Sequence, residues 1–362
     1  MLRVAHYTLA AACIALTLVG CQDAASPHDA AAPLGAVRTM SRADAAAPLE
    51  SLLVKPTDTD PAIQKALSEH YVWLDPAARH RKKLFVHMPG ARNTPSSFRL
   101  LAKEAARLGY HVIVLTYVND WDFTICNADP TCEENVRMEV IDGITRTAPF
   151  AVNPPDGIYN RLTKLLVYLA NNRPPDEGWS NFLDHGAPAW KRIAISGSSS
   201  GGAEAAMLAK LHRVRRVTLF AAPRDTVPGG LPPAWVALGA TPAQRYYGLV
   251  HDRDPLVAAT LASWPLLGMS QFGDPVYEDA SAPPYGGTHS LLTHRLPSSG
   301  SYLDAHPSVS RDQFTPIGPD GTPLLSDAWR HLLGADEGDE EVAGDQDEQS
   351  EAAVGRSRRE RQ

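Results

Sequence analysis

The chain has 362 residues, with 41 acidic and 34 basic side chains and a formal net charge of −7 at pH 7. This balance holds no basic excess, so the composition argues against nucleic acid as a partner. Residues 57–334 have the length of one large α/β domain, and no internal repeat is visible. We therefore expect one compact domain between two segments of different character.

The first 20 residues have the pattern of an export signal. Arg3 precedes an apolar run over residues 7–19, which is too short to span a bilayer stably. The run ends in Leu18-Val19-Gly20-Cys21, the small residue followed by cysteine that is typical of lipoprotein signals. We expect lipidation of Cys21, which would anchor the protein to a membrane. An ordinary secretory signal with an incidental cysteine is the alternative.

The expected location is the bacterial cell envelope, at the outer membrane or its periplasmic face, because Gln22 rather than Asp follows the cysteine. Residues 21–56 are rich in Ala, Asp and Pro and poor in large apolar side chains, which predicts a flexible tether. Residues 335–362 are acidic and end in a basic cluster, which predicts a disordered charged tail. A nucleic-acid arm is the alternative there, but the neighbouring acids and the export signal disfavour it.

Two cysteines remain for the folded part of the chain, Cys126 and Cys132. Because they lie in one short loop of an exported protein, they are expected to form a disulfide. A metal site would need more ligands than this loop offers, so neither a metal nor an organic cofactor is expected.

The central segment alternates strands and helices. Residues 83–88 form a compact apolar run before Pro89-Gly90, which predicts a buried strand. Thr94 is a predicted N-cap with Pro95 at the first helical position, and the apolar spacing from Phe98 to Leu108 predicts a helix over residues 95–108. The same patterns predict further strands over 111–117, 192–196, 217–222, 246–250 and 288–296, and helices over 158–171, 202–211 and 326–333. A long irregular insert is expected over residues 118–155. This order predicts a mostly parallel central sheet with helices on both faces.

The motif that indicates chemistry is Gly197-Ser198-Ser199-Ser200-Gly201, followed by Gly202. It lies between a predicted strand and a predicted helix, the context that a G-x-S-x-G nucleophile elbow requires. Such a turn exposes the central hydroxyl and directs the helix N-terminus toward the reacting oxygen. Ser199 is therefore the expected nucleophile. Ser198 and Ser200 lack glycines two residues away on both sides.

An oxyanion hole in this fold uses one backbone N–H from the residue after the nucleophile and one from the loop after an earlier strand. The first donor is then Ser200. For the second we choose Ala91, which follows Gly90 in the loop after the strand over 83–88.

The order in the chain is expected to be serine, acid, histidine. Asp254 follows the strand over 246–250 and precedes Pro255, which makes it the expected acid, with Asp252 as its competitor. Of the histidines that come later, His306 is the expected base and His289 the alternative, while His294 lies on the same predicted strand as His289. A polar surface or core role is the alternative for each.

Several runs resemble bacterial α/β-hydrolase lipoproteins of unassigned substrate, the BPSS-type group. They are Phe85-Val86-His87-Met88-Pro89-Gly90, Tyr110-His111-Val112-Ile113, the serine turn, Arg245-Tyr246-Tyr247-Gly248 and Pro284-Tyr285-Gly286-Gly287-Thr288-His289. The resemblance covers most of residues 72–333 and implies the α/β-hydrolase fold and a Ser-His-Asp hydrolase, but no natural substrate. Relatives more often carry His and Gln where this chain has Ser198 and Ser200.

Together these features predict a serine hydrolase that cleaves a small-molecule acyl ester or lipid through an acyl-enzyme. Trp121, Phe123 and Phe150 in the insert are candidates for an apolar acyl pocket, or equally for the insert's own core. Two other functions stay open. One is a catalytically silent, lipid-anchored binding protein of the cell envelope, and the other is an acyltransferase with the same triad.

Overall fold

The computed structural model describes residues 49–336, except residues 81, 122, 127, 128, 130, 148 and 149 and the side chains of residues 123 and 124. The predicted signal peptide, Cys21 and almost all of the charged tail lie outside the described residues. Within the described part, no helix is both long enough and apolar enough to cross a membrane.

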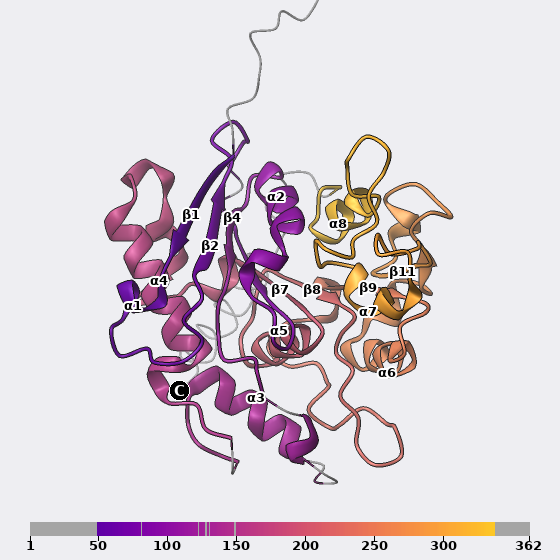
Figure 1. Ribbon diagram of the computed structural model, residues 1–362, viewed down its shortest axis with the longest axis horizontal. Coiled ribbons are helices and arrows are strands. Elements are labelled where there is room, and N and C mark those ends of the chain that lie inside the picture. The colour runs from indigo at the N-terminus through magenta and orange to yellow at the C-terminus, as the bar shows by residue number, and fades with distance from the viewer. Residues whose placement is uncertain are drawn as a thin grey trace, which may run out of the picture. The chain divides into compact units, whose positions relative to one another are not determined.

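A nine-stranded sheet forms the centre of the domain, in the order β1-β2-β4-β3-β7-β8-β9-β11-β10 (Figure 1). Its strands are β1 (Glu50–Val54), β2 (His70–Leu74), β3 (Leu84–Met88), β4 (His111–Val114), β7 (Ile193–Ser198), β8 (Arg216–Phe220), β9 (Tyr246–His251), β10 (Val276–Tyr277) and β11 (Ser290–Thr293). Strand β2 pairs antiparallel with both of its neighbours, and every other pair is parallel. The strands β5 (Leu183–Asp184) and β6 (Ala187–Pro188) form a separate hairpin.

Helices cover the sheet on both faces, as Figure 1 shows. They are α1 (Pro56–Thr59), α2 (Arg99–Arg107), α3 (Cys132–Asp142), α4 (Ile158–Asn172), α5 (Ser200–Leu211), α6 (Val257–Ser263), α7 (Ala305–Ser308) and α8 (Ser326–Leu332). Helix α2 packs against α8, whereas α3 packs against both α4 and α5. The mostly parallel α/β sheet that the sequence predicts is therefore confirmed.

The central strands form where the sequence has continuous apolar runs. Every residue of β3, β4, β7, β8 and β9 is buried. Parallel strands covered by helices on both faces need side chains that can be buried on either side, so an unbroken apolar run suits them better than alternation. These strands match the predicted ones, with ends displaced by a few residues. The largest displacement is in β4, which stops at Val114.

The structure corrects three expectations about local structure. The tether does not reach residue 56, because residues 50–54 form β1 and pair with β2. The insert over 118–155 is not irregular throughout, since it contains the 11-residue helix α3. Thr94 does not cap a helix with its side chain. Its hydroxyl bonds to Ser96, and a short 3-10 turn separates it from α2.

Candidate active site

The turn between β7 and α5 holds Ser199 in an unusual backbone conformation. Its φ is +55° and its ψ is −124°, and α5 begins at the next residue. A positive φ in a non-glycine residue is strained and is typical of functional turns. Ser199 is half-buried, whereas its neighbours Ser198 and Ser200 are buried. Of the three serines, Ser199 is therefore the one with access to solvent.

The glycines of the turn are required by close packing. A Cβ on Gly197 would lie 2.1 Å from the carbonyl oxygen of Gly201, and a Cβ on Gly201 would lie 2.2 Å from that of Met88. On Gly202 it would meet the Ala222 side chain at 2.4 Å. No side chain fits at these distances, so the two glycines of the G-x-S-x-G pattern follow from a close contact within the turn and from a close contact with β3.

The loop after β3 touches the nucleophile turn. A Cβ on Gly90 would lie 2.9 Å from the carbonyl oxygen of Ser198 and 3.1 Å from Ser199 Cβ. The glycine thus lets the loop pass directly beside Ser199, with Ala91 next in sequence. No hydrogen bond from the backbone N–H of Ala91 or Ser200 is found among the described residues. Both predicted oxyanion donors therefore lie close to the turn with an available N–H.

Two side chains that follow β4 hold this loop in place. Tyr117 donates its hydroxyl hydrogen to the carbonyl oxygen of Pro89 at 2.7 Å. The Asn119 amide donates to the carbonyl oxygens of Gly90 at 2.8 Å and Asn93 at 2.9 Å. The backbone of Asn119 in turn accepts from the N–H of Arg92 at 3.0 Å. This clamp could not be predicted from the sequence, because neither side chain belongs to a recognisable motif.

The predicted acid and base lie side by side. Asp254 follows β9, His306 lies in α7, and His306 Nδ1 is 2.6 Å from Asp254 Oδ2. The other carboxylate oxygen accepts the backbone N–H of Leu256 at 2.8 Å. Asp254 is buried, while the His306 side chain is 24 % exposed. A buried carboxylate that fixes a partly exposed imidazole is the arrangement of acid and base in a Ser-His-Asp triad.

The electrostatic state of Asp254 is set by opposing effects. Burial raises the pKa of Asp254, but the hydrogen bond and charge of His306, the Leu256 N–H and the charge of Arg224 lower it. The result is a pKa below the ordinary value for aspartate. Asp254 is therefore ionised at neutral pH and able to hold His306 Nδ1 in its protonated form.

The competing acid and histidines have other partners. The Asp252 carboxylate lies 3.2 Å from His251 Nδ1 and accepts the Tyr277 hydroxyl at 3.2 Å. His294 pairs with Asp279 at 2.9 Å. None of these pairs includes Asp254.

His289, the alternative base, is a buried core residue just before β11. Its ring stacks between those of Tyr247 and Phe272, with centroid distances of 3.9 and 3.8 Å. Its Nδ1 lies 2.9 Å from the carbonyl oxygen of Tyr246. The structure thus brings His306, and not His289, to Asp254.

A buried polar network lies beneath the nucleophile. Ser198 Oγ is 2.6 Å from Ser310 Oγ and 3.3 Å from His87 Nε2, and His87 Nδ1 is 3.1 Å from Ser196 Oγ. Burial lowers the pKa of His87 to about 3, so its ring is neutral. The network joins the strand before Ser199 to the segment just after the helix that carries His306.

A second buried network joins α3 to the nucleophile helix. Arg137 donates to both oxygens of Asp225 at 2.5 Å, to Glu204 at 2.9 Å and to the carbonyl oxygen of Ser200 at 3.3 Å. Its guanidinium also lies about equally far from the rings of Trp121 and Trp235, at 5.6 and 5.5 Å. The expected disulfide between Cys126 and Cys132 is present and joins the start of α3 to the preceding turn.

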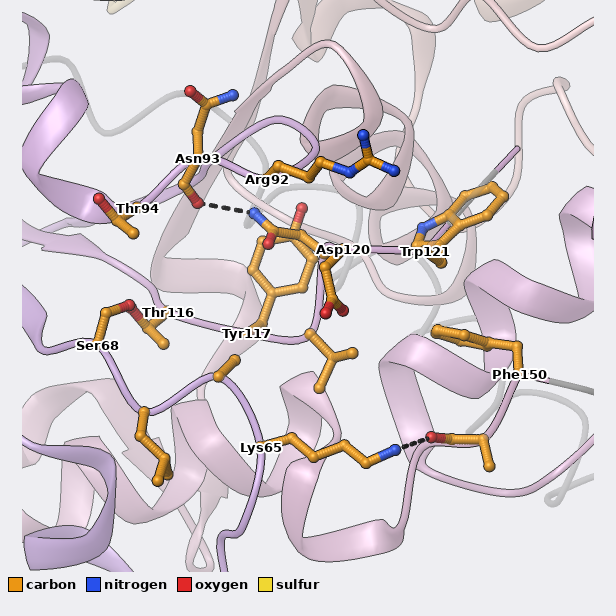
Figure 2. Close-up of a pocket in the computed structure, with 15 residues that line it drawn as sticks. Lys65, Ser68, Arg92, Asn93, Thr94, Thr116, Tyr117, Asp120, Trp121 and Phe150 are labelled. Carbon is orange, nitrogen blue, oxygen red and sulfur yellow. Dashed lines mark hydrogen bonds between the residues drawn. The ribbon is translucent and has the colours of Figure 1, made fainter. Parts of the chain in front are cut away.

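A cavity of about 750 Å³ lies beside the clamped loop (Figure 2). Its wall includes Arg92 and Tyr117 as well as Trp121 and Phe150 from the insert. Two of the three aromatic residues proposed for a pocket therefore line a cavity, and Trp121 also packs in the core. The side chain of the third, Phe123, is not described. No cluster of His, Cys, Asp or Glu suited to a metal ion occurs in the described part of the chain.

Comparisons with known proteins give no family, but they give likenesses to solved structures. No family model matches the chain, and no curated protein matches it. A protein from Klebsiella pneumoniae subsp. pneumoniae MGH 78578 assigned as a dienelactone hydrolase is 13 % identical with a TM-score of 0.38, covering 80 % of this chain and 98 % of that one. A bacterial heroin esterase is 16 % identical with a TM-score of 0.39, covering 80 % and 83 %. The assignment of the α/β-hydrolase fold rests on the parallel sheet and on the serine turn between β7 and α5.

Proposed function

We propose that this chain is a serine hydrolase that cleaves carboxylic esters through a covalent acyl-enzyme. The observation that carries the proposal is the bond between His306 and the buried Asp254 in a fold that holds Ser199 on a strained, glycine-framed turn. In this fold the nucleophile and the acid follow different strands of one parallel sheet, and their side chains converge at the carboxyl ends of those strands.

The proposed reaction uses only side chains and backbone groups of this chain. His306 Nε2 accepts the hydroxyl proton of Ser199 as Oγ attacks the ester carbonyl, and Asp254 stabilises the imidazolium that results. The N–H groups of Ala91 and Ser200 bind the developing oxyanion. His306 then protonates the leaving alcohol. In the second half of the reaction, His306 accepts a proton from water as the water attacks the acyl-enzyme, and it returns a proton to Ser199 Oγ as the carboxylic acid leaves.

Replacing the nucleophile tests this proposal. The Ser199→Ala variant should lose both fluorophosphonate labelling and the hydrolysis of nitrophenyl esters. Ser200→Ala should keep labelling because it retains the backbone N–H. Ser198→Ala should keep labelling too, although it leaves Ser310 and His87 with one partner fewer, at a cost of about 1–3 kcal/mol in the free energy of unfolding. If Ser199→Ala matches the unmodified protein in both assays, the proposal is wrong.

We also propose that the hydrolase is anchored by lipid on Cys21 in a bacterial cell envelope. The support is the Leu-Val-Gly-Cys pattern after a short apolar run. The candidate site lies wholly within residues 49–336, so the proposed anchor and the proposed chemistry can be tested separately.

A further inference from the structure

The cavity beside the oxyanion loop has an arginine, Arg92, on its wall. Arg92 is exposed, and no ion pair to it is found among the described residues. It follows Gly90 by two residues, so the two Cα atoms are at most about 7.6 Å apart. Gly90 lies against Ser199, so the loop after β3 joins this wall of the cavity to the nucleophile turn, although neither Ser199 nor His306 lines the cavity.

The backbone of Arg92 is strained and firmly held. Its φ is +59°, in the left-handed region that a residue with a side chain adopts only at a cost and that glycine adopts freely. Its N–H donates to the carbonyl oxygen of Asn119. The side-chain amide of Asn119 donates to the carbonyl oxygens of Gly90 and Asn93, which flank Ala91 and Arg92 in sequence. The arginine thus projects from a fixed point, and glycine at this position would keep the same backbone.

The other charges of the cavity leave it net positive. Lys65 lies on the wall opposite Arg92, and its ammonium donates to the carbonyl oxygen of Ala151 at 2.6 Å (Figure 2). That bond uses one of three N–H donors. Asp120 is the acid of the wall, and in Figure 2 its carboxylate points away from the Arg92 guanidinium. A guanidinium without a carboxylate partner is suited to bind a carboxylate of a ligand through two parallel hydrogen bonds.

We propose that this cavity binds an anionic group of the ester substrate and that Arg92 is the residue that selects it. This inference rests on the proposed function and narrows it to esters that bear a carboxylate near the scissile bond. The carboxylate belongs either to the acyl part or to the alcohol part, because both flank the attacked carbonyl. The carboxylate of Asp120, which also lines the cavity, should repel an anion bound there.

Matched pairs of esters test the inference. The acyl pair is 4-nitrophenyl hydrogen succinate and its neutral methyl ester, and the alcohol pair is 4-acetoxybenzoate and its methyl ester. For each pair we compare the kcat/KM of the anionic ester with that of its neutral methyl ester. For one of the two pairs, this ratio should fall about tenfold in Arg92→Gly, which corresponds to the low end of the free energy of a charge-assisted hydrogen bond. Arg92→Gly should keep or raise Tm, since glycine relieves the strain.

Two further variants sharpen the comparison. Asp120→Asn should raise the same ratio, because it removes a negative charge from the cavity. Arg213→Gln serves as the control for lost positive charge, since Arg213 is exposed and lies beyond the C-terminal end of α5, and it should leave the ratio unchanged. Equal ratios in the unmodified protein and Arg92→Gly for both pairs would overturn the inference and leave the hydrolase proposal standing.

A binding measurement separates the inference from the proposed function. Calorimetric titration of Ser199→Ala with monomethyl succinate and with 4-acetoxybenzoate should detect binding of one of these anions, about tenfold weaker when Arg92→Gly is added. If no ester is hydrolysed but this difference is found, the hydrolase proposal is wrong and the anion site stands. If neither protein binds either anion, or both proteins bind each anion equally, the anion site is wrong.

Discussion

At the scale of single residues, the pair of Asp254 and His306 dominates the candidate site. Because hydrogen bonds from His306 and Leu256 outweigh the effect of burial, the folded pKa of Asp254 lies below its unfolded value, near 3.8. A lowered carboxyl pKa contributes stability above the unfolded pKa, and this stability is lost as the pH falls through the folded pKa. The same bond therefore links the proposed chemistry to acid stability.

We expect Asp254→Asn to reduce kcat by about 10⁴, the loss seen when a serine protease triad keeps its imidazole in the wrong tautomer. Below pH 4, the Tm of the variant should also fall less steeply than that of the unmodified protein, because the titrating carboxyl group is gone. Steady-state rates and thermal melts between pH 2 and pH 7 measure both effects. Asp252→Asn is the control, since Asp252 pairs with His251 and Tyr277. A larger rate loss in the control would move the acid to Asp252.

The residues of the site differ in how far the sequence reveals them. Ser199 could be predicted because the close contacts of Gly197 and Gly201 force glycine at fixed spacing. Asp254 and His306 could be narrowed to a few candidates by their order in the chain, but only their 2.6 Å contact separates His306 from His289. Asn119 and Arg137 could not be predicted, since their partners lie up to 88 residues away in sequence.

At the scale of elements, helix α3 is tied to the nucleophile helix by buried charges. Arg137 is fully buried between Glu204 of α5 and Asp225, which follows β8. We expect Arg137→Met to lower the free energy of unfolding by about 3–5 kcal/mol, because it leaves two buried carboxylates without their partner. Arg146→Met, which breaks a pair with Asp142 at the end of the same helix, should cost about 0–1 kcal/mol.

Denaturant unfolding of the two variants measures this difference. A stability of Arg137→Met within 1 kcal/mol of that of the control would contradict the role assigned to the buried network. The disulfide at the start of α3 is left intact in both variants, so it does not enter the comparison.

Glu133, in the first turn of α3, predicts a pH dependence of the opposite sign to that of Asp254. Burial, followed by the nearby charge of Asp225, raises the pKa of Glu133 to about 7. A raised carboxyl pKa contributes stability that is complete below the unfolded pKa, near 4.5, and is lost as the pH rises through about 7. In Glu133→Gln the Tm should therefore fall less between pH 5 and pH 8 than in the unmodified protein. The adjacent Glu134→Gln is the control, and identical pH profiles for all three proteins would refute the assignment.

Two of the missed elements, α3 and β1, have a physical reason for being missed. Helix α3 buries Arg137 and Glu139 together with its apolar residues, so its sequence does not show one apolar face. Strand β1 lies at the edge of the sheet and is largely exposed, so it lacks the apolar character of the central strands, whereas β2 is mostly buried and pairs antiparallel with both of its neighbours. Apolar patterning predicted the elements that are buried on both faces, but not those held by buried charge or by edge pairing.

At the scale of the whole molecule, the proposed anchor and the candidate site are widely separated along the chain. Residue Cys21 lies 28 positions before Leu49, the first described residue. A chain of that length spans at most about 100 Å when fully extended. A lipid on Cys21 would set where the protein works, and the residues of the candidate site all lie within residues 49–336.

Substitution of Cys21 tests this separation. Expressed in a bacterial host, Cys21→Ser should incorporate no radiolabelled palmitate and should leave the membrane fraction, because acyl chains supply about 0.8 kcal/mol of membrane binding per buried CH₂. Its kcat/KM for a soluble ester should equal that of the unmodified protein, since Ser199, Asp254 and His306 are unchanged. Cys13→Ser, which alters a cysteine within the predicted signal, is the control and should remain lipidated. Palmitate that persists in Cys21→Ser would contradict the anchor, while a loss of soluble activity in that variant would mean that the N-terminal segment contributes to the active fold.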